Sequence, residues 1–242
     1  MLDKIALKNI LFLDVETVPQ VEDFNQLSPA LQDLWVKKAQ RIAPADQEPV
    51  AEELFFEKAG IYSEFGKIVC ISAGFFYGDD DDLKFRCKAF YSDKESELLT
   101  NFAALLRSSF NQHHHYLCGH NAREFDFPYI ARRMLINQIP LPDILNIPGR
   151  KPWEVTLLDT MDLWKFGDYK NYTSLALLAA VFDIPTPKDD IQGSDVARVY
   201  WKEKDLNRIA VYCNKDVVTT ARLYLKYCVK GELTDENVES LV

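Results

Sequence analysis

Two acidic residues, Asp14 and Glu16, stand at the end of an apolar run with one residue between them. The run, residues 10–13, is typical of a buried strand. Because side chains alternate along a strand, the two carboxylates face the same side, with Cα atoms roughly 6.5 Å apart. Carboxylates this close repel each other and lose hydration, and a divalent cation such as Mg²⁺ relieves both costs. The alternative for such a pair is a strand that has run out into solvent.

A third acidic residue, Asp126, lies between a predicted strand at 116–119 and a predicted helix. Pro128 suits the first turn of that helix. Taken alone, Asp126 is interpreted as a helix N-cap, a position that aspartate favours. It becomes a candidate metal ligand only if the fold brings it to the first acidic pair.

A fourth acidic residue, Asp216, is part of the last predicted helix, which runs from about Asp205 to Cys228. Tyr212 precedes it by four residues, so the two side chains lie on one helix face, beside the apolar stripe. The alternative for this pair is a half-buried tyrosine next to an aspartate that pairs with a nearby cation. Such pairs are common on helices. This pair therefore indicates a functional site only if the fold brings it close to the other acidic residues.

The predicted elements must bring these side chains together. The early strands fit an antiparallel meander, and the strands separated by helices fit parallel pairing through right-handed crossovers. We therefore expect an α/β fold with one mixed five-stranded sheet flanked by helices, in which Asp14 and Glu16 lie on a central strand. Ligands of such sheets gather at the ends of the central strands, where Asp126 and Asp216 can also reach. The strands are predicted at residues 10–16, 67–77, 83–91, 116–119 and 155–159.

Two further segments carry predictions about the fold. The sequence Ser92-Asp93-Lys94-Glu95 has the pattern of a capping box at the start of the helix after the third strand. Residues 20–65 interrupt the order of strands and are predicted to form a helical and loop insertion, to which no chemistry is assigned. We expect one domain over residues 1–242 that includes this insertion.

The composition is that of an ordinary globular protein, because 48% of the 242 residues are hydrophobic and 27% are charged. No segment approaches the roughly 18 consecutive apolar residues of a membrane-spanning helix. The N-terminus lacks a signal-peptide pattern, so we expect a cytoplasmic protein without a membrane partner. The five cysteines are widely spaced without a CxxC pair, which argues against a zinc site and favours reduced thiols.

The net charge of −9 counts against a nucleic acid partner, because proteins of that class usually carry a basic surface. Bound divalent cations would offset part of this charge locally. A local basic strip would offset more, and the residues considered for it are Arg123, Arg132, Arg133, Arg150 and Lys151.

Three stretches around the acidic residues resemble the motifs of the DEDD superfamily of 3′–5′ exonucleases. The first motif is matched by residues 12–17 (Phe-Leu-Asp-Val-Glu-Thr), the second by residues 119–126, and the third, in its Tyr-x-x-x-Asp form, by residues 212–216. The resemblance is to predicted exonucleases related to the proofreading domain of family-B DNA polymerases, and residues 173–185 and 193–196 add to it. It covers most of residues 8–228 and is weakest over 20–62.

The resemblance implies a ribonuclease H-like fold and two bound divalent cations, Mg²⁺ or Mn²⁺. The cation ligands that it implies are Asp14, Glu16, Asp126 and Asp216. It also implies that Tyr212 holds or helps to activate the attacking water. Two metal ions can activate a hydroxide and stabilise the leaving 3′ oxygen. Because free tyrosine has a pKa of about 10, we expect Tyr212 to orient the water by hydrogen bonding rather than to remove its proton.

Three residues that flank the candidate ligands, Thr17, Asn121 and Phe125, are predicted to contact nucleic acid. Phe125 would stack on a terminal base, an interaction worth roughly 1–3 kcal/mol. The alternative is that Phe125 belongs to the core. For Asn121 the two interpretations are a substrate contact and a turn residue.

We therefore expect a metal-dependent 3′–5′ exonuclease that acts on the 3′ end of single-stranded nucleic acid, with DNA favoured, and releases nucleoside 5′-monophosphates. It acts alone or together with a replication or repair protein. One alternative is a nuclease-fold module that has lost catalysis and binds nucleic acid or a protein. The other is an RNA-processing exonuclease, because recognition of a 2′-OH depends on the shape of the pocket.

Overall fold

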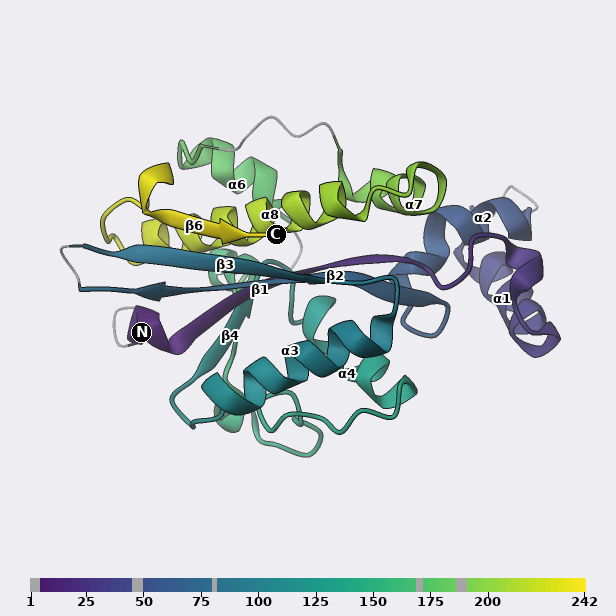
Figure 1. Ribbon diagram of the computed structural model, residues 1–242, viewed down its shortest axis with the longest axis horizontal. Helices are drawn as coiled ribbons and strands as arrows, with labels where there is room; N and C mark the ends of the chain where they lie inside the picture. Colours follow the sequence, from purple (N-terminus) through teal and green to yellow (C-terminus); the bar gives the residue numbers. More distant parts are fainter. Residues whose placement is uncertain (1–4, 45–49, 80–81, 169–171, 186–190) are drawn as a thin grey trace.

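The computed structural model describes residues 5–44, 50–79, 82–168, 172–185 and 191–242. Its centre is a six-stranded mixed sheet with the strand order β5-β4-β1-β2-β3-β6 and with helices on both faces (Figure 1). The strands are β1 (Ile10–Pro19), β2 (Gly66–Tyr77), β3 (Lys84–Tyr91), β4 (Tyr116–Gly119), β5 (Leu157–Asp159) and β6 (Val238–Leu241).

The strands β1, β2 and β3 pair antiparallel, whereas β4 pairs with β1, β5 with β4 and β6 with β3 in parallel. β1 therefore lies inside the sheet, between β2 and β4. The five strands predicted from the sequence are present, and the mixed α/β sheet is confirmed. The prediction missed β6, whose residues are mostly exposed and show no apolar alternation.

The helices predicted after the third and fourth strands and at the end of the chain are present, and the short helix α5, directly after β5, was not predicted. The described α-helices are α1 (Pro29–Ile42), α2 (Ala51–Lys58), α3 (Glu95–Ser109), α4 (Asp126–Ile136), α5 (Thr160–Lys165), α6 (Leu175–Val181), α7 (Val196–Arg198) and α8 (Leu206–Tyr227). A π-helical turn, η7 (Val199–Glu203), follows α7, and the 3₁₀ turns are η2 (Leu7–Asn9), η3 (Phe24–Gln26), η4 (Ala59–Ile61), η5 (Pro152–Glu154), η6 (Gly193–Asp195) and η8 (Asp235–Asn237). None of the described helices is long and apolar enough to cross a membrane.

The two faces of β1 pack against different helices. Leu11 and Leu13 belong to the core that α3 and α4 cover. Phe12, which points to the other face, packs against Tyr224 of α8, and α8 lies on the opposite side of the sheet from α3 and α4 (Figure 1). Because side chains alternate along a strand, Asp14 and Glu16 continue the row of Phe12 and face α8.

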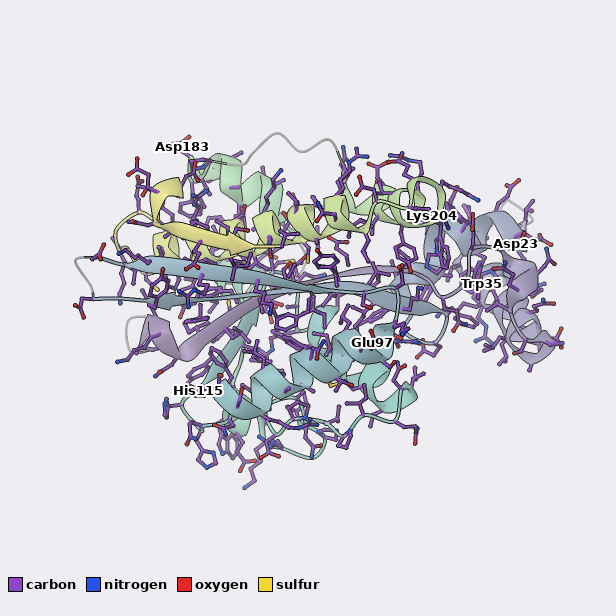
Figure 2. The ribbon with its side chains drawn as sticks, viewed as in Figure 1. Asp23, Trp35, Glu97, His115, Asp183 and Lys204 are labelled. Carbon is purple, nitrogen blue, oxygen red and sulfur yellow. The ribbon has the colours of Figure 1, made fainter. Side chains whose placement is uncertain are left out.

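The segment between β1 and β2 forms a helical group at one end of the sheet (Figure 1). Its helices pack around Trp35, which is fully buried among them (Figure 2). The group is held tightly against β1, because a Cβ on Gly60 in η4 would lie 3.2 Å from the backbone of Val18. The hydroxyl of Tyr129 in α4 donates a hydrogen bond of 2.7 Å to the carbonyl of Gly60. This group is therefore fixed to both β1 and α4.

A buried ion pair joins α3 to α4 beneath the sheet. Glu95 accepts hydrogen bonds from Ile68 N at 2.7 Å and from Arg133 Nε at 2.9 Å. Arg133 also donates to the carbonyl of Ser63 at 2.8 Å. The predicted capping box is wrong, because Glu95 turns into the core and the N-cap of α3 is Lys94, whose side chain makes no capping hydrogen bond.

The edge strand β6 is attached to α8 as well as to β3. Asn214 of α8 donates hydrogen bonds to Ser240 Oγ at 3.1 Å and to the carbonyl of Leu241 at 3.2 Å. It also accepts a hydrogen bond of 3.1 Å from the thiol of Cys87 in β3. These bonds fix α8 over the sheet at the level of the third sequence motif.

Candidate active site

The first acidic pair lies on β1 and faces α8. A carboxylate oxygen of Asp14, one of Glu16 and the sulfur of Cys213 all lie within 4.8 Å of one another. Cys213, on α8, donates a hydrogen bond of 3.4 Å to Asp14 Oδ2. Glu16 is only 8% exposed, so the alternative of a strand end in solvent is wrong.

The pairing of β1 with β2 is interrupted beside this pair, where β2 carries one extra residue, Val69. β1 and β2 keep one register as far as Glu16, and the register shifts between Glu16 and Thr17. An extra residue of this kind bends the strand that carries it and increases the local twist. Glu16 is thus the last residue of β1 before the register shifts, a feature that strand alternation alone does not predict.

Asp126 reaches the site from the edge of β1 that lies next to β4. β4 pairs with β1 only as far as Phe12, so the following residues of β1 have no strand partner on that side. Asp126, the first residue of α4, occupies this edge: its Oδ1 accepts a hydrogen bond of 3.1 Å from Val15 N. The N-cap interpretation is wrong, because Phe125 holds that position and Asp126 is buried against β1.

Asp216 and Tyr212 approach the same place from α8. The hydroxyl of Tyr212 is hydrogen-bonded to the carboxylate of Asp216, as expected for side chains four residues apart on a helix. The charge of Asp216 raises the pKa of both Asp14 and Glu16. The structure thus brings the five predicted catalytic residues together from β1, α4 and α8.

The pKa values show that negative charge is crowded at this point. Burial raises the pKa of Asp14 and of Glu16 well above the usual range, and the neighbouring carboxylates raise both further. Burial also raises the pKa of Asp126 to about 7, although hydrogen bonds from its own N–H and from Val15 N–H oppose the rise. No cationic side chain of the described residues is among the main causes of these shifts.

This set of donors fits divalent cations. Carboxylate oxygens are the ligands that Mg²⁺ and Mn²⁺ prefer, and a bound cation would relieve the repulsion between Asp14 and Glu16. Cys213 lies outside the donor set: burial raises the pKa of its thiol, which stays protonated and donates to Asp14. The candidate ligands are therefore the four carboxylates, and their role as ligands stays a prediction.

The three predicted nucleic acid contacts lie around Asp126. Thr17 is hydrogen-bonded to Tyr129, and the ring of Phe125 packs against the same tyrosine with ring centroids 5.3 Å apart. Phe125 is only half-buried, so packing and base stacking both remain open to it. Asn121 has a φ of 59°, which is typical of a turn residue, and among the described residues its buried Oδ1 has no hydrogen-bond partner. Contact of these residues with nucleic acid stays a prediction.

Two residues that the sequence did not single out organise the loop before α4. The ring of His120 bridges Thr160 Oγ1 and the carbonyl of Thr173, each at 2.9 Å. Asp159, at the end of β5, accepts hydrogen bonds from two backbone N–H groups of the loop, each at 2.9 Å. Asp159 is also the N-cap of α5, a position that aspartate favours. An aspartate directly before a predicted helix could have pointed to this N-cap, but α5 was not predicted from the sequence.

The basic strip considered from the sequence does not form as a whole. Arg133 is buried in its ion pair with α3. Arg150 and Lys151 precede β5, whereas Asp126 follows β4. Since β4 and β5 are parallel, the two basic residues lie toward the opposite end of the sheet from Asp126. Arg123, with its side chain 45% exposed, remains beside the site.

Comparison with known proteins identifies a family whose model matches this chain. Residues 61–242 match the model of a family described as predicted 3′-5′ exonucleases related to the exonuclease domain of PolB. No curated protein matches the chain. The matched range includes Asp126, Tyr212 and Asp216, whereas Asp14 and Glu16 precede it, so their place in the site rests on the geometry of β1.

The fold agrees with the family. A mixed sheet flanked by helices is the ribonuclease H-like arrangement that the resemblance implied. The matched range also covers most of the chain, from η4 to the last described residue. The protein therefore belongs to the family of predicted 3′-5′ exonucleases related to the exonuclease domain of PolB.

Proposed function

We propose that the protein is a metal-dependent 3′–5′ exonuclease. It hydrolyses the phosphodiester bond at the 3′ end of single-stranded nucleic acid, with DNA favoured over RNA, and releases nucleoside 5′-monophosphates. The observation that carries the proposal is the convergence of four carboxylates and one tyrosine from three separate elements. Carboxylates crowded in this way cost folding free energy, which indicates a functional reason for their presence.

The four carboxylates would hold two divalent cations, Mg²⁺ or Mn²⁺. Such cations, when bound, supply a strongly nucleophilic water at neutral pH and stabilise the charge on the leaving 3′ oxygen. The protein contributes the ligands and their orientation. The backbone N–H of Val15 fixes the carboxylate of Asp126 at the edge of β1, and the thiol of Cys213 does the same for Asp14.

Tyr212 acts as a hydrogen-bonding group rather than as a base. Burial raises its pKa, and the charges of Asp216, Glu16 and Asp14 raise it further. The phenol therefore keeps its proton at neutral pH. With its O–H bonded to Asp216, its oxygen can still accept a hydrogen bond, which suits a group that orients the attacking water.

The test uses 5′-labelled single-stranded DNA and RNA of one sequence, each incubated with Mg²⁺ or Mn²⁺. We expect a ladder that shortens from the 3′ end, faster on DNA, and that disappears with EDTA or with Asp14→Ala. Asp33→Asn, an exposed change on α1, serves as the control with full activity. Hydrolysis that survives EDTA and Asp14→Ala would contradict the proposal.

The two alternatives give different results in the same assay. Tight binding of both strands without hydrolysis would indicate a nucleic acid-binding module. Faster hydrolysis of RNA would indicate an RNA-processing enzyme.

The proposal extends to a partner and a location. A replication or repair protein is the partner class, which the relation of the family to PolB supports. The cytoplasm is the location, which the five free cysteines support, because thiols stay reduced there. Co-purification from a cytoplasmic extract, with and without nuclease treatment, tests both.

A further inference from the structure

The loop that carries Asp126 into the site is sharply bent. It begins after Gly119, where a Cβ would lie 2.4 Å from the Cβ of Ala122 and 3.0 Å from the carbonyl oxygen of Leu13. The next turn needs the left-handed conformation of Asn121, with a φ of 59°. In this conformation the loop passes close to the backbone of β1. Hydrogen bonds from other elements are needed to keep it in this position.

A single side chain from another strand supplies those partners. Asp159 Oδ1 accepts a hydrogen bond from Asn121 N, and Oδ2 accepts one from Arg123 N, both at 2.9 Å. Oδ1 also accepts hydrogen bonds from Met161 N at 2.9 Å and from Asp162 N at 3.4 Å. Asp159 is 2% exposed, so a buried carboxylate joins the end of β5, the start of α5 and the loop.

Backbone hydrogen bonds connect this loop to the first turn of α4. Phe125 N donates to the carbonyl of Asn121 at 3.1 Å, and Phe127 N donates to the carbonyl of Ala122 at 2.9 Å. Asp126 stands between these two donors. Its side chain is also anchored to β1 by the hydrogen bond of 3.1 Å from Val15 N. The position of Asp126 therefore depends on the loop below it and on β1 beside it.

The chemistry of this anchor favours a carboxylate over a neutral side chain. Two N–H groups with one residue between them form a small concave donor site that suits an anion. Hydrogen bonds to a charged acceptor are about twice as strong as neutral ones. Asparagine has the same shape as aspartate but offers one acceptor oxygen. Its NH₂ group would meet one of the loop N–H donors, so the loop would lose a bond and gain a repulsive contact.

We propose that Asp159 is a positioning residue, which fixes the loop before α4 and thereby holds the carboxylate of Asp126 where a divalent cation binds. The inference rests on the proposed function, because it gives Asp126 its role as a ligand. Asp159 itself stays bonded to the loop and takes no part in the reaction.

The test measures cation binding and hydrolysis separately. Wild type and Asp159→Asn are titrated with Mn²⁺ without nucleic acid, with the free ion followed by electron paramagnetic resonance. Hydrolysis of the labelled oligonucleotide is then followed against Mn²⁺ concentration. We expect the Mn²⁺ midpoint to rise about 10- to 100-fold in both experiments, as for other residues that orient metal ligands. At saturating Mn²⁺ the KM for the oligonucleotide should stay within twofold of wild type.

The control is Ser28→Ala, which removes the N-cap hydrogen bond of 3.4 Å that Ser28 Oγ accepts from Leu31 N in the helical group, outside the loop before α4. It should leave the Mn²⁺ midpoint unchanged. A second variant, Asp159→Ala, leaves a small space at the two loop N–H groups. Formate, but not chloride at equal ionic strength, should bring the Mn²⁺ midpoint of this variant back toward that of wild type.

A Mn²⁺ midpoint of Asp159→Asn equal to that of wild type would overturn the inference. So would a midpoint of Asp159→Ala that formate does not change while thermal melts show a folded protein. If wild type binds Mn²⁺ and Asp159→Asn binds it more weakly, yet neither hydrolyses nucleic acid, the positioning role holds and the proposed function fails.

Discussion

Asp126→Asn should make the cation-free protein more stable near neutral pH, although it removes a candidate ligand. The carboxylate is 4% exposed, and burial raises its pKa from 3.8 to about 7. Asparagine has the shape of the neutral acid, and its oxygen can still accept the hydrogen bond from Val15 N. The variant therefore keeps the contact with β1 and removes the buried charge.

The size of the effect follows from the two pKa values. A carboxyl group whose pKa is higher in the folded state binds its proton more tightly there, so this group favours folding most at low pH. That contribution is lost as the pH rises from 3.8, the unfolded value, through about 7. The difference between the two values corresponds to about 4 kcal/mol. We expect Asp126→Asn to gain about 2–4 kcal/mol at pH 8 and less than half of that at pH 5.

The assay is urea unfolding of both proteins in EDTA at the two pH values, with Asp33→Asn as a surface control. Excess Mg²⁺ should narrow or reverse the difference at pH 8, because a ligand at 100 times its Kd stabilises the protein that binds it by about 3 kcal/mol. The reasoning would be refuted if Asp126→Asn were less stable than wild type in EDTA at pH 8. It would also be refuted if the gain were the same at both pH values.

The remaining predictions concern single side chains. Asp14→Ala should lower the hydrolysis rate more than about 100-fold, beyond the effect of changes outside the ligand set; a wild-type ladder in the labelled-strand assay would remove Asp14 from the site. Tyr212→Phe should lower kcat about 10- to 100-fold, the worth of one hydrogen bond to a polarised water, while fluorescence anisotropy shows unchanged oligonucleotide binding; full activity would contradict its role. Arg133→Met should lower the free energy of unfolding by about 3 kcal/mol, because Glu95 then keeps a buried, unpaired charge. Denaturant unfolding checks this value, and a loss below about 1 kcal/mol, typical of an exposed ion pair, would argue against it.

The sequence predicts the parts of the site that depend on one element. Asp14 and Glu16 share a face because strands alternate, and Tyr212 and Asp216 share a face because they are four residues apart on a helix. Both relations are properties of the local backbone. The sheet also followed from local patterns, except for β6, whose place depends on hydrogen bonds from Asn214 rather than on apolar alternation.

The sequence does not predict contacts in which a distant partner decides the role of a residue. Asp126 has the pattern of an N-cap, yet it bonds to Val15, which lies 111 positions away. Glu95 completes a capping-box pattern, yet it pairs with Arg133, which lies 38 positions away. In both cases the local bond is worth less than the hydrogen bonds that burial requires. Such choices follow from the packed fold and cannot be read from spacing.

The candidate site has a consequence for the order in which the chain is synthesised and folds. Its contacts join residues 111 and 199 positions apart, from β1 to α4 and from β1 to α8. At about 5–20 residues per second, synthesis needs about 10–40 s to pass from the first of these elements to the last. α8 must leave the ribosome before it packs on β1, so a nascent chain holds an incomplete set of the candidate ligands. The site is thus complete only once α8 has been synthesised and packed against β1.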